Sequence, residues 1–212
     1  MNGPERQQLR ERVSAARKAQ VAPEPAEPRP AGGKHSWPLP DGVQGRAVFS
    51  LDGEYRYVLR REWEGGSGVC TFVGLNPSTA KAEADDPTVR KCWRWAREWG
   101  YTSMVMLNLF AYRTTSPAAL ADSYYPVGYD NDAYLAALAA EADLLIAAWG
   151  NSKHVRADAR DEEVTALLLE HVESGWIHAL ALCQDGSPRH PLYLPNATKP
   201  IPWRQRKEKA AA

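Results

Sequence analysis

Apolar runs and helix-like segments alternate along the central and C-terminal parts of the chain. Short apolar runs bounded by glycine or polar residues are typical of buried strands, and here they occupy 68–75, 103–110, 143–150 and 177–182. Segments whose apolar residues recur at helical spacing occupy 85–100, 130–142 and 159–172. Strands that alternate with helices of this length predict an α/β fold, a three-layer sandwich with a mostly parallel central sheet.

The N-terminal part of the chain shows two other patterns. Residues 46–63 alternate between apolar and polar positions around Asp52-Gly53, which predicts an N-terminal β-hairpin with a type I′ turn. Residues 1–41 are charged and rich in proline, and they carry too few apolar side chains to offset the entropy lost on folding. We therefore expect a disordered N-terminal extension over 1–41 and a single α/β domain over 42–203.

The C-terminal end of the chain is basic. Residues 199–209 hold five basic side chains against one acidic side chain. Such a segment is typical either of a solvated end or of an arm that contacts phosphate. We expect residues 204–212 to form a disordered basic tail.

The composition adds limits on compartment and partners. The 212 residues carry a formal net charge of zero, so no overall basic field attracts nucleic acid. Cys70, Cys92 and Cys183 form no close pair in the sequence, which indicates a reducing compartment, and the first two fit core positions. No apolar run is long enough to span a membrane. We expect a cytoplasmic monomer that does not bind a membrane.

Two acidic residues, Asp85 and Asp86, precede the helical segment that begins near Pro87. A carboxylate at this place caps the free N–H groups of the first turn, and proline is favoured at the first helical position. Neighbouring carboxylates also suit a Mg²⁺ ion, but no third ligand has an obvious place in the sequence. We therefore predict a helix cap, with no metal and no cofactor in the site.

Polar and aromatic side chains follow each of the four predicted core strands. The carboxyl ends of parallel strands lie at one edge of a sheet, where open α/β sheets bind their ligands. The candidate site residues at these ends are Gly74, Asn76, Pro77, Ser78, Asn108, Tyr112, Arg113, Asn151, Arg189, His190 and Tyr193. Amides can pair with the edge of a base, rings can stack on its face, and cations can meet phosphate. The set therefore predicts a site for a planar heteroaromatic ligand.

Two of these residues also have ordinary structural explanations. Asn76 stands in a strand-to-helix turn, where Asn, Pro and Ser are common. Asn108, inside an apolar run, fits a core amide whose hydrogen bonds are satisfied. His190 differs, because it lies in a loop where packing does not explain an imidazole, and we interpret it as functional.

The order of four motifs resembles the uracil-DNA glycosylase superfamily across residues 69–195. GLNPSTA looks like that family's water-activating loop, and VMLNLFAYR is similar to the strand whose asparagine pairs with the base. LLIAAWGNSKHV resembles a later strand that ends in Trp-Gly, and HPLYL resembles the loop that carries the histidine. The LNPSTA and DDPT pattern also resembles a bacterial and phage domain family of unknown function. The resemblance implies a uracil-DNA-glycosylase-like fold.

The resemblance also implies roles for individual residues. Asn76 and His190 would be the catalytic pair: Asn76 holds the attacking water, and His190 stabilises charge on the departing base. Asn108 would select the base, and Tyr193 or Tyr112 would stack on it once it is flipped out. Asn76 departs from the most active relatives, which carry aspartate there, because an amide cannot act as a general base.

These patterns lead to an expected function. We expect the protein to bind a nucleobase, a nucleotide or single-stranded nucleic acid, with N-glycosidic hydrolysis as the leading reaction. The loop carries Leu192 where the family has serine, and it lacks the apolar wedge that glycosylases insert into a duplex. Two alternatives stay open. One is a non-catalytic nucleotide or single-stranded nucleic-acid binding module, and the other is a different enzyme acting on modified nucleotides.

Overall fold

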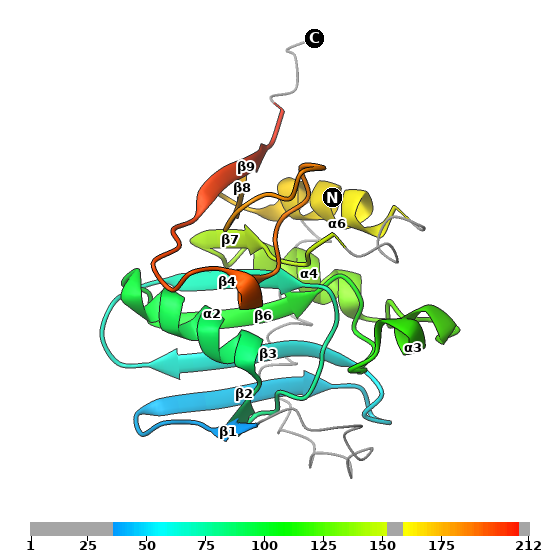
Figure 1. The fold of residues 1–212 in the computed structure, drawn as a ribbon, viewed down its shortest axis with the longest axis horizontal. Helices are drawn as coiled ribbons and strands as arrows, with labels where there is room; N and C mark the ends of the chain where they lie inside the picture. Colours follow the sequence, from blue (N-terminus) through cyan, green and yellow to red (C-terminus); the bar gives the residue numbers. More distant parts are fainter. Residues whose placement is uncertain (1–35, 152–158, 208–212) are drawn as a thin grey trace, which may run out of the picture.

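A computed structural model describes residues 36–151 and 159–207 of the chain (Figure 1). Residues 1–35 of the expected extension and 208–212 of the expected tail lie outside the described residues. Most of the described strands belong to one seven-stranded sheet with the order β2-β3-β6-β4-β7-β8-β9. These strands are β2 (Val43–Phe49), β3 (Arg56–Trp63), β4 (Val69–Gly74), β6 (Ser103–Asn108), β7 (Leu144–Ala147), β8 (Trp176–Ala179) and β9 (Ile201–Gln205).

The sheet is mixed. Strands β6, β4, β7 and β8 pair in parallel, as the four predicted apolar runs require. Strands β2 and β3 on one side and β9 on the other pair antiparallel. The described sheet thus has three parallel and three antiparallel pairings, and the prediction of a mostly parallel sheet is not confirmed. The β2–β3 pair is antiparallel because its connection, residues 50–55, is too short to hold a crossover helix.

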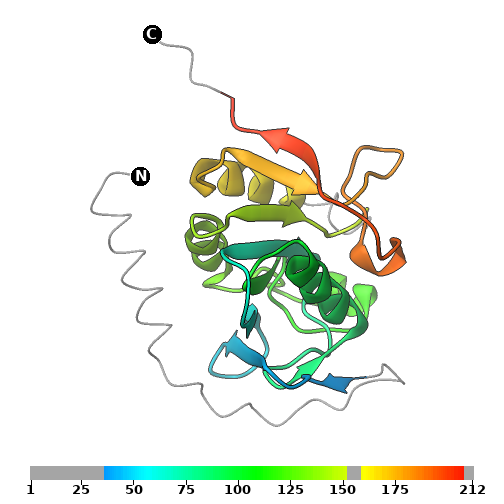
Figure 2. The same ribbon diagram turned by 90° about the vertical axis from the view of Figure 1, so that its left-hand side faces the viewer.

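Helices pack against both faces of this sheet (Figures 1 and 2). The described helices are α2 (Pro87–Glu98), α3 (Pro117–Asp122), α4 (Asn131–Ala139), α6 (Arg160–His171) and the 3₁₀ turn η1 (Pro191–Tyr193). Helix α2 covers one face, and α4 and α6 cover the other. The fold is therefore mixed α/β, in agreement with the predicted class.

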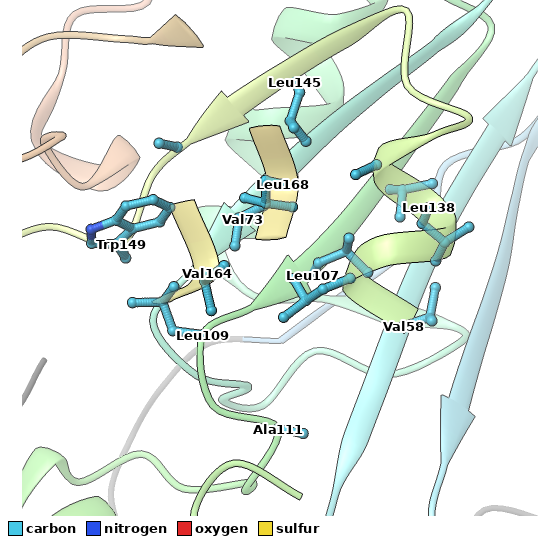
Figure 3. Packing of buried hydrophobic residues seen from close by; sticks show 14 of the residues in the cluster. Val58, Val73, Leu107, Leu109, Ala111, Leu138, Leu145, Trp149, Val164 and Leu168 are labelled. Atoms are coloured by element: carbon cyan, nitrogen blue, oxygen red, sulfur yellow. The ribbon is translucent and has the colours of Figure 1, made fainter. Parts of the chain in front are cut away.

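Side-chain alternation along the central strands divides the core in two. Val73, Leu107 and Leu145 face α4 and α6, as Figure 3 shows. Their neighbours in sequence, such as Phe72 and Met106, face α2. Strands buried on both faces read as continuous apolar runs rather than alternating ones, which is why they stand out in the sequence. Cys70 and Cys92 are buried free thiols in the α2 core, as predicted.

The N-terminal hairpin is confirmed, but its turn is not type I′. Strands β2 and β3 pair antiparallel with Val43 opposite Trp63. A type I′ turn needs positive φ at both central residues, whereas φ is positive at Gly53 (71°) and not at Asp52. The Gly53 amide donates to the Ser50 carbonyl instead, at 3.0 Å. A longer loop thus replaces the predicted two-residue turn.

Helix α2 begins and ends where its sequence indicates. The Asp86 carboxylate accepts a hydrogen bond from the Val89 amide at 2.8 Å, and Pro87 occupies the first helical position. Gly100 follows the helix with φ 91°, the left-handed conformation that favours glycine after a C-terminus. The neighbouring Asp85 has a different role, because it is buried against β3 and pairs with Arg61.

The Arg61–Asp85 pair holds the β4–α2 connection on the sheet. The Arg61 Nε lies 2.9 Å from Asp85 Oδ1, and both side chains are almost fully buried. Asp85 Oδ2 accepts a second bond from the Trp93 indole at 2.7 Å, while the Arg61 guanidinium also donates to the Lys81 and Ala84 carbonyls. Burial raises the pKa of Asp85, although Arg61 favours the charged form.

Two strands extend beyond the expected domain limits. Strand β1 (Trp37–Pro38) pairs with the short β5 (Ala84–Asp85). Strand β9 runs through Arg204 to Gln205 and forms an edge of the main sheet beside β8. The basic segment therefore contributes an edge strand rather than only a solvated end. Its basic side chains suit an edge, because charge there discourages pairing with other chains.

We expect Asp85→Ala to lower the free energy of unfolding by about 3–5 kcal/mol, because it leaves the Arg61 guanidinium buried without its partner. Urea unfolding followed by tryptophan fluorescence measures the change. Glu62→Ala is the matched control, since Glu62 pairs with Arg46 and Arg60 at the surface. That change should amount to less than about 1 kcal/mol. Equal losses in the two variants would contradict a structural role for the buried pair.

Candidate functional site

The candidate site lies at the carboxyl ends of β6, β4 and β7. The parallel register places Gly74 directly beside Asn108 and Val73 beside Ala147. The β4 and β6 ends stay connected beyond the strands, since the Leu109 and Phe110 amides donate to the Gly74 and Leu75 carbonyls. The first two motifs of the sequence therefore meet at one edge of the sheet.

Asn108 lies against the backbone of Gly74. A Cβ atom placed on Gly74 would stand 3.0 Å from Asn108 Oδ1, so any larger residue would crowd this amide. The residue is only 3% exposed, and its Nδ2 makes no hydrogen bond within the described part of the chain. Buried polar atoms nearly always have a partner. The expectation of a satisfied core amide is therefore not met at Nδ2.

His190 lies over the end of the neighbouring strand β7. A Cβ atom on Gly150 would stand 3.4 Å from the His190 Cβ. The His190 Nδ1 accepts a hydrogen bond from the Leu192 amide at 3.3 Å and caps η1. In the neutral ring this bond leaves the proton on Nε2.

Asn108 and His190 share one face of the sheet. Met106, which points to the same side of β6 as Asn108, belongs to the core beneath α2. The η1 turn after His190 is held to that helix, because Lys91 donates to the Leu192 carbonyl at 3.3 Å. Gly74 at the end of β4 and Gly150 just after the adjacent β7 thus leave space under side chains from distant parts of the sequence.

Asn76 has a structural function in the loop after β4. Its Nδ2 donates to the Thr114 carbonyl at 2.7 Å and to the Pro77 carbonyl at 3.0 Å. The Pro77 carbonyl also accepts from the Thr114 amide. This amide group therefore fastens the β4 loop to the segment that follows β6. The turn explanation given by the sequence accounts for these bonds.

Tyr112 and Arg113 lie toward the β2–β3 hairpin rather than toward His190. The Tyr112 ring packs edge-on against Tyr55, with centroids 6.1 Å apart. Arg113 donates to the Gly53 carbonyl at 2.7 Å, and its guanidinium lies 4.7 Å from the Phe49 ring centroid. Both residues hold the hairpin loop, which explains their side chains without a ligand.

The other predicted residues lie at the surface or in the β4 loop. Asn151 and Arg189 are exposed, and Tyr193 is 76% exposed with its ring centroid 6.2 Å from that of His190. Pro77 is buried, and the Ser78 hydroxyl is buried without a hydrogen-bond partner among the described residues. The predicted set therefore divides: Asn108 ends β6 and His190 lies over the end of β7, whereas Asn76, Tyr112 and Arg113 tie loops together.

Sequence reasoning missed Arg56, a buried cation at the same edge. Its Nη1 donates to the Ala80 carbonyl at 2.6 Å, its Nε has no partner within the described residues, and burial lowers its pKa to about 10. The Thr79 hydroxyl next to this carbonyl is likewise buried and without a partner there. An arginine between two tyrosines in a strand was the available signal, but strand periodicity alone does not distinguish a buried charge from an exposed one.

The indole of Trp149 is a further buried donor near the end of β7. Its Nε1 makes no hydrogen bond to the described part of the chain, and its ring packs edge-on against Trp203 at 5.5 Å. Figure 3 shows the ring beside Val164 and Leu109 on the α4 and α6 side of the sheet. It therefore lies on the face opposite to Asn108.

Two kinds of site find no support in the described residues. No three His, Cys, Asp or Glu side chains within 36–151 and 159–207 gather as metal ligands. No helix in these ranges is long and apolar enough to cross a membrane.

The arrangement can be compared with known proteins. A family model described as "Protein of unknown function (DUF1643)" matches residues 56–192. The matched range begins at the buried Arg56 and contains Gly74, Asn108 and His190. No curated protein and no solved structure matches the chain.

We expect Gly74→Ala to lower the free energy of unfolding by about 1–3 kcal/mol, because the new methyl group crowds Asn108 Oδ1. Asn108→Ala removes the crowded atom, so the double variant should lose less than the sum of the two single losses. Urea denaturation of the four proteins gives the coupling energy. Strictly additive losses would show that the two side chains do not interact.

Proposed function

Because the chain belongs to the DUF1643 family of proteins of unknown function, we propose its function from the site itself: it binds a nucleobase or nucleotide at the carboxyl ends of β4, β6 and β7. The observation that carries the proposal is the buried Asn108 amide whose Nδ2 has no partner among the described residues. An unpaired buried donor costs about 1–3 kcal/mol. A ligand carbonyl at this position would recover that free energy.

The order of the parallel strands supports this location. Along the chain β4 comes first, β6 second, β7 third and β8 fourth, whereas in space the order is β6-β4-β7-β8. The connection after β4 leads to α2 on one face of the sheet, and the connection after β7 leads to α6 on the other face. The place between β4 and β7 is therefore a topological switch point, where open α/β sheets bind ligands. Gly74 is the last residue of β4, and Gly150 follows β7. This order and the motifs together support a uracil-DNA-glycosylase-like architecture.

The chemical groups fit a base. A carboxamide has an NH2 group that donates and an oxygen that accepts, so it can pair with a base edge in two places. Asn108 supplies that carboxamide, and its burial strengthens discrimination because a mismatched edge leaves it unsatisfied. Ser78, Thr79 and Arg56 add donors in the adjoining loop region, where the phosphate of a nucleotide would be held.

N-glycosidic hydrolysis is the leading reaction for this site. The C1′–N bond breaks with its electron pair passing to the base, water adds to C1′, and the proton that the water loses is taken up by the departed base. The His190 Nε2–H would donate to the base oxygen on which negative charge develops. The Leu192 bond to Nδ1 supports this role, because it favours the tautomer with Nε2 protonated.

A non-catalytic binding module is the second candidate, and Asn76 favours it. An amide cannot take a proton from water. Its nitrogen is also already bonded to the Thr114 carbonyl, as a loop fastener would be. In this case the base is bound and recognised by Asn108, and no bond is broken.

Substitution of two buried amides, Asn108 and Asn131, distinguishes an effect on ligand binding from an effect on stability. The Asn131 Nδ2 donates to the Asn108 and Leu109 carbonyls, both at 3.1 Å. We expect Asn108→Ala to weaken binding of the preferred nucleoside monophosphate by 10- to 100-fold in calorimetric titrations, equivalent to about 1–3 kcal/mol. Asn131→Ala should instead lower the free energy of unfolding by about 1–3 kcal/mol. Unaltered affinity in Asn108→Ala would exclude base recognition by this residue.

Incubation with labelled single-stranded oligonucleotides containing uracil or other modified bases tests hydrolysis, with alkaline cleavage revealing abasic sites. We expect His190→Ala to reduce the rate by about 10²–10³-fold, the loss typical of one charge-stabilising donor. His171→Ala is the control, because His171 bonds the Leu167 carbonyl within α6 and lies outside the site. Hydrolysis that survives His190→Ala unchanged would remove this mechanism. Binding without any cleavage would favour the non-catalytic module.

A further inference from the structure

A groove of about 280 Å³ runs along the outward side of α2, away from the sheet. Its helical lining recurs at Pro87, Arg90, Lys91, Arg94 and Glu98, one face of the helix over three turns. Trp37 of β1 and Leu192 of η1 also line this groove. We call this feature the α2 groove.

The α2 groove is cationic in a chain of zero formal net charge. Arg90, Lys91 and Arg94 line it against a single carboxylate, Glu98. Arg90 and Arg94 are four residues apart, about 6 Å along the helix axis. A row of cations with this spacing on one face attracts a chain of negative charges more strongly than it attracts an isolated one.

Aromatic surface lies beside these cations. The Arg90 guanidinium is 5.1 Å from the Trp37 ring centroid, and the half-buried indole forms part of the groove. Arg94 is exposed. Cations next to an aromatic ring are the pattern with which proteins bind single strands, because the strand presents both phosphates and base faces. A duplex stacks its base faces inside and presents only its phosphates to such a surface.

The α2 groove and the candidate base site share a wall. Leu192 lines the groove, and its amide donates to the Nδ1 of His190, which belongs to the site. Lys91 holds this wall by donating to the Leu192 and Leu194 carbonyls, and it lies 5.1 Å above the Trp95 ring centroid. A ligand that reaches both places has to be extended and has to pass over η1.

We infer that the α2 groove binds the backbone of a single-stranded nucleic acid whose base occupies the site at Asn108 and His190. This inference rests on the proposed function for the base and adds that the ligand is a polymer rather than a free nucleotide. Arg94 and Arg90 contact phosphates. Lys91 is a positioning residue that keeps η1 against α2.

Fluorescence anisotropy of a labelled twelve-nucleotide single strand, titrated with the full chain from 50 to 200 mM salt, tests the inference. We expect Arg94→Ala to weaken binding about 3- to 10-fold at 50 mM salt. It should also lower the slope of log K against log salt by about 0.7, the value for one lost single-strand phosphate contact. Arg97→Ala is the matched control, because Arg97 is an exposed arginine on the same helix that does not line the groove.

Several outcomes would overturn the inference: equal effects of Arg94→Ala and Arg97→Ala, no binding of the strand, tighter binding of the matching duplex, or tighter binding of an acidic peptide of equal charge. Titration with a nucleoside monophosphate separates this failure from failure of the proposed function. If Asn108→Ala weakens monophosphate binding while Arg94→Ala leaves strand binding unchanged, only the groove inference fails. If Arg94→Ala weakens strand binding while Asn108→Ala leaves it unchanged, the proposed base site fails, and with it the placement of a base there, whereas backbone binding by the groove stands.

Discussion

The parallel pairing of β4 with β6 is the constraint on which the candidate site depends. This pairing sets Gly74 beside Asn108, and a Cβ atom on the glycine would stand 3.0 Å from the asparagine oxygen. A shift of one residue in register would turn each side chain to the opposite face of the sheet. The buried amide would then enter the core beneath α4 and α6. The fold therefore holds a costly polar group at one place, the end of a strand, where we propose that a ligand binds.

Helix α2 connects this edge to the rest of the molecule. Its first turn is fixed by Asp86, and the connection before it is held by the Arg61–Asp85 pair inside the protein. With one side packed on Phe72 and Met106, the helix presents its arginines outward. The same element thus stabilises the core and lines the α2 groove. This double role explains why α2, although half buried, carries so many charged residues.

Adjacent positions at this edge of the sheet differ in whether their hydrogen bonds are satisfied. Asn131 and Arg160 donate to the Leu109 carbonyl and satisfy the backbone at the end of β6. Asn108, one residue earlier, keeps a buried nitrogen without a partner among the described residues. Natural proteins accept such local costs mainly at functional sites. The contrast between adjacent positions separates the groups that hold this edge together from the group that we propose recognises a ligand.

The sequence by itself determined the central strands, the limits of α2, the hairpin and the polar strand ends, because periodicity, caps and glycines are local signals. It indicated Asn108 and His190 and left a structural and a catalytic interpretation of Asn76 open, since the Thr114 carbonyl that binds it lies 38 residues away. Only the tertiary structure decided that Arg56 is buried, that β9 is an edge strand, and that the arginines of α2 line a groove. Each of these depends on contacts between distant segments, and the energy of such contacts is absent from any local pattern.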